Sequence, residues 1–174
     1  KLKELSQKIA QDSANEYCKT FLKNSNSKLS SEKITKLSDP DIQYNLTQSI
    51  MMAGRKNDSE LHDHLSRLMI ERINVDENDL KKIIYNEAIQ TIGKLTINQL
   101  KILTACLLLR YITQNNITTL EAYEEYLQRF VIPFLDFNST NADFQHIEYT
   151  GCGSVLGIGS WSFLKRIKND YAQL

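Results

Sequence analysis

The sequence is poor in the residues that mark several classes of protein. Its 174 residues include only three cysteines, two prolines and one tryptophan. Cys18, Cys106 and Cys152 are odd in number and far apart, and no C-x-x-C pair occurs. Neither a zinc ribbon nor a dithiol motif is therefore expected. This cysteine usage favours a reducing, cytoplasmic compartment.

The chain also lacks an excess of charge and a long apolar run. Lys plus Arg and Asp plus Glu each number 21, so the formal net charge is zero. Nucleic-acid binders normally carry a basic stripe, so we expect no nucleic-acid partner. No apolar run approaches the roughly 18 residues that span a bilayer, so we expect no membrane partner. A net charge near zero gives weak electrostatic repulsion between molecules, which fits a chain that is part of an oligomer or of a larger protein.

Length and composition favour one folded domain. Hydrophobic residues make up 41% of the chain and charged residues 24%, close to the globular average. A chain of this length can bury a sizeable core. We expect a single helical domain over residues 1–174. Because the chain begins at Lys1 without Met, we also expect it to be a fragment of a longer protein.

Apolar residues recur at spacings of three and four along most of the chain, which predicts an all-α fold. Capping residues mark several starts, among them Asp39 before Pro40, Asp58 or Ser59, Thr96, and the pair Thr118–Thr119. The expected helices cover residues 2–22, 31–37, 40–54, 59–73, 80–92, 97–113, 120–135, 142–149 and 161–171.

Residues 97–113 form the most hydrophobic of these helices. Apolar side chains cover nearly its whole circumference, and a helix that is apolar all round is buried on all sides. We therefore predict a bundle of about seven to nine helices around this central helix. Pro133 should kink or end the helix 120–135 near Val131, because proline lacks a donor and clashes one turn back.

Residues 151–159 hold four of the six glycines, and Trp161 follows two residues later. The segment fails the P-loop pattern, since no lysine occurs before Lys165, and Leu156 occupies the third glycine position of the dinucleotide pattern. We interpret it as a constrained turn that docks Trp161 and the last helix onto the bundle. A small-ligand sensor at this turn is an alternative.

Two sequence features resemble chemical sites without meeting their requirements. Cys152 lies between two glycines, and His146 could serve as its base, but no activating neighbour can be identified. A cysteine-dependent enzyme built on this pair is an alternative; a buried filler is the expectation. In His62–Asp63–His64 the histidines point about 200° apart on a helix and cannot share a metal ion, so solvated surface is expected. No cofactor or metal site is expected.

The aromatic residues after Thr119 are more suggestive. They recur at threes and fours, and because the helix 97–113 is already apolar all round, a spare apolar face could pack against a partner. Our leading hypothesis is a non-catalytic interaction or self-association module, whose partner is itself or another protein. The expected interface residues are Tyr123, Tyr126, Phe130, Phe134 and Trp161.

Three blocks carry a family resemblance: Asp39–Tyr44, the Lys94–Leu100 stretch with its Thr96 and Gln99, and Gln145–Gly153. On these blocks the chain resembles, over essentially its whole length, a family of bacterial proteins of unknown function that carry locus-tag labels. The pattern from Glu60–Leu61 to Ile102–Leu103 is also weakly similar to helical domains of abortive-infection proteins. The resemblance implies a cytoplasmic bacterial module connected with phage defence and supplies no catalytic residue.

Overall fold

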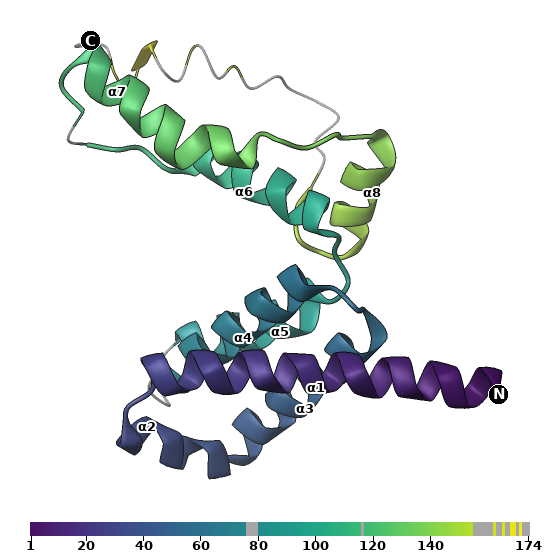
Figure 1. Ribbon diagram of the computed structural model, residues 1–174. Coiled ribbons are helices and arrows are strands. Elements are labelled where there is room, and N and C mark those ends of the chain that lie inside the picture. Colours follow the sequence, from purple (N-terminus) through teal and green to yellow (C-terminus); the bar gives the residue numbers. More distant parts are fainter. Residues whose placement is uncertain are drawn as a thin grey trace. The chain divides into compact units, whose positions relative to one another are not determined.

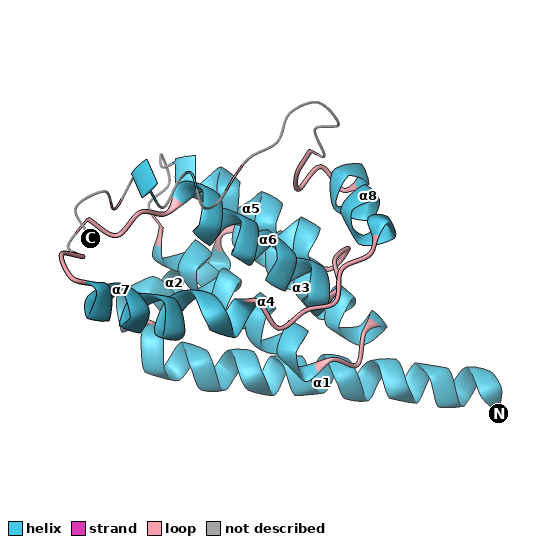
Figure 2. Cartoon of the chain, turned by 90° about the horizontal axis from the view of Figure 1, so that it is seen from above, coloured by secondary structure: helices cyan, strands magenta, loops and turns pink. Residues whose placement is uncertain are grey.

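The computed structural model describes residues 1–75, 80–115 and 117–154, together with Ser162, Lys165, Lys168, Asn169 and Tyr171. The elements in this part of the chain are helical, as Figures 1 and 2 show. The described residues form eight α-helices. The expected all-α class is confirmed. The expected last helix 161–171, Trp161 and the glycines beyond Gly153 lie outside the described residues.

The helices group into two compact units, Lys1–Lys94 and Leu95–Leu174. The first unit contains α1 (Leu2–Lys28), α2 (Ser31–Thr35), a 3-10 turn η1 (Lys36–Ser38), α3 (Pro40–Arg55), α4 (Ser59–Asn74) and α5 (Leu80–Ile92). Helix α1 packs against α3 and α4, and α4 packs against α5. In the described part of the chain no helix is both long and apolar enough to cross a membrane.

The expected start signals of the first unit act as helix caps. The Asp39 carboxylate accepts hydrogen bonds from the backbone N–H groups of Asp41 and Ile42, and Asp58 caps α4 in the same way. These bonds satisfy donors that a helix start leaves without partners. Helix α1 is longer than expected and reaches Lys28.

Helix α4 is the most buried helix of the first unit. Packing against α1, α3 and α5 covers it on several sides. Eight of its sixteen residues are buried: Leu61, His62, Leu65, Ser66, Met69, Ile70, Arg72 and Ile73. The core of this unit is therefore organised around α4.

The second unit contains α6 (Ile97–Tyr111), α7 (Leu120–Tyr126), a π-helical turn η2 (Leu127–Val131), a 3-10 turn η3 (Ile132–Phe134) and α8 (Asn141–Tyr149). The turns η2 and η3 pack against α6. The expected end near Val131 is confirmed, because the α-helical and π-helical geometry gives way to a 3-10 turn around Pro133. A small core joins the elements: Leu95, Ile102 and Ile147, with Leu100, Leu103, Phe137, Phe144 and Cys152 packed on it.

The helix expected over residues 97–113 is shorter and less buried in the structure than predicted. Helix α6 ends at Tyr111 and buries only Gln99, Ile102 and Ala105. Leu107 is 51% exposed and Tyr111 67% exposed, so the prediction that this helix is buried all round is wrong. Among the described elements of its own unit, α6 packs mainly against the short turns η2 and η3.

Candidate functional site

The glycine segment begins as the end of α8. Gly151 has a φ of 76°, the left-handed conformation that favours glycine. Its N–H donates to the Glu148 carbonyl at 3.0 Å, and the Cys152 N–H donates to the Ile147 carbonyl at 3.1 Å. This pair of bonds is the Schellman motif, which satisfies carbonyls left open at a helix C-terminus. A helix cap therefore accounts for the described start of the segment.

We expect Gly151→Ala to destabilise the second unit by about 1–2 kcal/mol, the cost of left-handed backbone for a residue with a Cβ. No atom lies within 4 Å of the Cβ position at Gly151, so the loss would come from the backbone alone. Gly151→Asn should cost less, because asparagine tolerates this conformation. Hydrogen exchange of the α8 amides measures the destabilisation in both variants. Equal protection in the alanine variant and the wild type would contradict the prediction.

Cys152 and His146 make separate contacts. The half-buried Cys152 packs on the core of the second unit, and its Sγ lies 3.9 Å from the Thr150 carbonyl oxygen. His146 Nδ1 lies 3.1 Å from Gln99 Oε1, and no hydrogen bond joins the imidazole to Cys152 Sγ. Because Gln99 Oε1 also accepts from the Thr96 N–H, we assign the proton to Nδ1 of His146. The geometry gives Cys152 a packing role.

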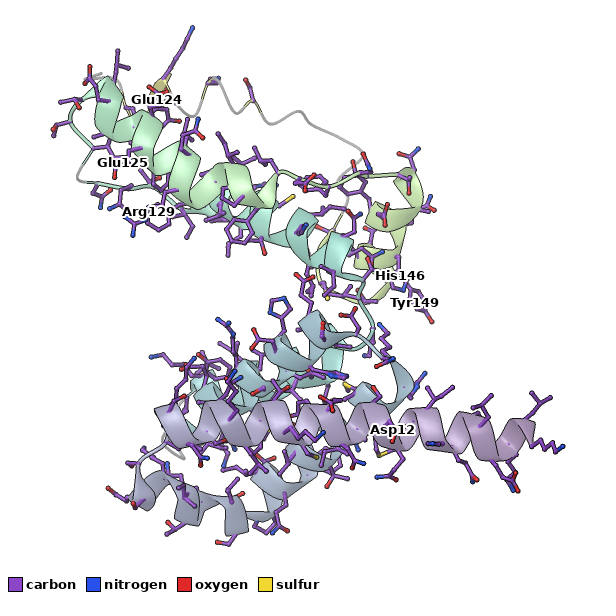
Figure 3. The ribbon with its side chains drawn as sticks, in the orientation of Figure 1. Asp12, Glu124, Glu125, Arg129, His146 and Tyr149 are labelled. Atoms are coloured by element: carbon purple, nitrogen blue, oxygen red, sulfur yellow. The ribbon has the colours of Figure 1, made fainter. Side chains whose placement is uncertain are left out.

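Gln99 links two helix starts. Thr96 and Gln99 form a capping box on α6, and Thr140 and Asp143 form one on α8. Gln99 Nε2 donates to Asp143 across the two helices. Hydrogen bonds from the Thr140 backbone and side chain lower the pKa of Asp143. The His146 ring stacks beside Tyr149 on α8 (Figure 3). These contacts hold α6 and α8 together.

A serine–histidine pair is buried in the first unit. Ser13 Oγ donates to the Ala53 carbonyl at 2.6 Å and lies 3.3 Å from His62 Nε2. His62 Nε2 also lies 3.3 Å from the Lys56 carbonyl, which can only accept, so we assign the proton to Nε2. A protonated Nε2 cannot act as a base toward Ser13. The pair instead satisfies carbonyls at the end of α3.

The expectation of solvated surface at His62 is wrong. Its side chain is only 3% exposed, and its ring lies edge-on to the buried ring of Tyr17. Burial raises the pKa of Tyr17 above its ordinary value. His64, two positions away, lies at the surface beside Glu60. In the described part of the chain no group of three His, Cys, Asp or Glu side chains converges on a possible metal position.

A second polar cluster joins α3, α4 and α5. Arg72, 2% exposed, donates through Nε to Asn86 Oδ1 at 2.7 Å and through its guanidinium to Asp41. Asn86 also donates to Asp41, and Asn45 donates to Asn86 Oδ1 at 3.1 Å. Burial raises the pKa of Asp41, but the hydrogen bonds from Asn86 and Arg72 outweigh it and lower the pKa below its ordinary value.

The aromatic residues of the predicted interface form a row along α7 and η2. Ring centres lie 6.4 Å apart for Tyr123 and Tyr126, and 5.9 Å apart for Tyr126 and Phe130. Tyr171 extends the row, with its ring centre 4.8 Å from that of Tyr123. Phe130 is 50% exposed and Phe134 38% exposed. The row therefore ends in exposed aromatic surface.

A pocket of about 160 Å³ lies beside this row. Charged side chains of both signs, Glu125 and Arg129, line the pocket. They are four residues apart and project from one side of the helix formed by α7 and η2. Glu124 projects from the other side (Figure 3). The Arg129 guanidinium lies 5.3 Å from the Phe130 ring centre. The lining residues are Gln114, Ile117, Ala122, Glu125, Tyr126, Arg129 and Phe130.

One family model matches the chain over residues 1–174, and it describes a family with a locus-tag label and no characterised function. The chain belongs to this family. The resemblance noted from its sequence blocks is confirmed to that extent. No curated protein and no solved structure matches the chain. The similarity to abortive-infection domains is not shown by these comparisons and stays a prediction.

Two of the three resemblance blocks of this family member have structural roles that sequence reasoning missed. Asp41 lies in the first turn of α3, and it also joins Arg72 and Asn86. Gln99 not only caps α6 but also contacts α8. Sequence spacing carries no signal for either link, because the partners lie 31 to 47 positions apart.

Proposed function

We propose that this chain is a non-catalytic helical module that self-associates through an aromatic surface of the second unit. We define the aromatic surface as Tyr126, Phe130, Ile132, Phe134 and Leu135. The observation that carries the proposal is the exposure of four large apolar side chains within six positions, at 50%, 45%, 38% and 43% for Phe130, Ile132, Phe134 and Leu135. Such clusters on a soluble protein mark interaction sites.

Physical chemistry supports association at this surface. Burying one large apolar side chain is worth roughly 1.5–3 kcal/mol relative to leaving it in water. A formal net charge of zero provides little repulsion between copies. The π-helical turn within the surface supports a functional role, because such turns occur frequently at functional sites.

A cytoplasmic setting is part of the proposal. Cys18, Cys106 and Cys152 are all free thiols, which fits a reducing compartment.

Size-exclusion chromatography with light scattering tests self-association. We expect the apparent mass to rise above 20.1 kDa as the concentration reaches the high micromolar range. Phe130→Ser should shift the protein toward monomer. Tyr149→Ser is the matched control, since Tyr149 is an aromatic residue 87% exposed on α8, outside the aromatic surface. A wild-type protein that stays monomeric at high micromolar concentration would overturn the proposal.

A further inference from the structure

We infer that the partner is a second copy of this chain, docked antiparallel along α7 and η2 across a two-fold axis near Leu127. This inference rests on the proposed function and specifies its partner and register. In a two-fold interface the same surface of both copies meets itself, so one surface must supply both halves of every contact. The pocket beside α7 and its neighbouring residues meet this requirement in two ways.

The first is a match of shape. A cavity of roughly 150 Å³ in a protein holds one benzene molecule. The pocket here, at about 160 Å³, has the size for one aromatic ring, and the rings of Tyr126 and Phe130 line it. Phe130 is half exposed, so it can both border its own pocket and reach the pocket of the second copy. Offset or edge-to-face contact between such rings is favourable.

The second is a match of charge. Glu125 and Arg129 lie on one side of the helix formed by α7 and η2 (Figure 3). Among the described residues, neither forms an ion pair. In an antiparallel pair centred on Leu127, residues equally far from 127 on either side face each other. Glu125 of each copy then lies opposite Arg129 of the other, so the contact forms twice. A parallel pairing would place like charges opposite each other.

Shape and charge require the same register. Centring the pair on Leu127 places Phe130 of one copy opposite position 124 of the other. The pocket side chains Ala122, Glu125 and Tyr126 surround that position along the helix. The ring therefore reaches the pocket in the same arrangement that pairs Glu125 with Arg129. This agreement favours a second copy over an unrelated partner.

Charge reversal in two separate variants tests the register. Glu125→Arg and Arg129→Glu each place like charges opposite each other in their own dimers, so we expect each to raise the dissociation constant about tenfold. In an equimolar mixture of the two variants, both cross-copy contacts join opposite charges, and dimer should return. Sedimentation velocity of the single variants and of the mixture measures this.

The mixture separates contacts between copies from effects within the helix. Positions 125 and 129 carry like charges within each variant, so recovery cannot come from a repaired intrahelical pair. Arg67→Glu is the control, because it reverses one exposed charge on α4, which is not part of the proposed interface, and it should leave the dissociation constant unchanged. A wild-type dimer whose variants do not recover on mixing would overturn the register but leave self-association standing. A monomeric wild type would overturn both.

Discussion

Arg72→Ala is expected to destabilise the first unit by about 3–5 kcal/mol. Arg72 is among the largest fully buried side chains. Its truncation leaves a cavity where α4 packs against the neighbouring helices. The change also removes the donors that contact Asn86 Oδ1 and the Asp41 carboxylate. Urea unfolding followed by circular dichroism, with hydrogen exchange of the α4 amides to identify the unit, measures the loss.

The Arg72 contact should also depend on pH. The pKa of Asp41 is lowered in the folded protein, so its contribution to stability is present above the ordinary pKa of an unfolded aspartate, about 3.9. That contribution is lost as the pH falls through the folded pKa. The destabilisation by Arg72→Ala should therefore be larger at pH 6 than at pH 3.

Arg67→Ala provides the matched control for Arg72→Ala. Both arginines lie on α4 and pair with an aspartate, but the Arg67 side chain is 62% exposed and that of Arg72 is 2% exposed. A surface pair of this kind contributes about 0.3–0.5 kcal/mol. If the two alanine variants unfold at the same urea concentration, the polar cluster around Arg72 does not have the stabilising role assigned to it.

The helices and most of their starts could be predicted from the sequence because their causes are local. Asp39 followed by Pro40, and Thr96 followed by Gln99, act within one turn of helix, where spacing along the chain determines distance in space. The end near Val131 follows in the same way from Pro133. The aromatic row was also visible as a spacing of threes and fours.

The burial of His62 and Arg72 could not be predicted in this way. Their neighbours Ser13, Asp41 and Asn86 come from other helices, and periodicity within α4 does not reveal them. The pocket could not be predicted either, since Gln114 and Ile117 reach it from a connecting segment. Local pattern predicts which residues form a helix, whereas the number of neighbours around that helix depends on the whole chain.

Which helix is central can be tested by two matched leucine substitutions. Leu65 on α4 is fully buried, so Leu65→Ala should cost about 2–5 kcal/mol through lost burial and an unfilled cavity. Leu107 on α6 is 51% exposed, and Leu107→Ala should cost at most about 0.5 kcal/mol. The sequence pattern alone predicts the opposite order, because residues 97–113 form the more hydrophobic helix.

Hydrogen exchange measured peptide by peptide gives the cost in each unit separately. It should be recorded at low micromolar concentration, so that association does not protect α6. Faster exchange in α4 of Leu65→Ala, with little change in α6 of Leu107→Ala, is the expected result. A larger loss for Leu107→Ala would mean that α6 is buried in solution and that the sequence pattern ranked the burial of the two helices correctly.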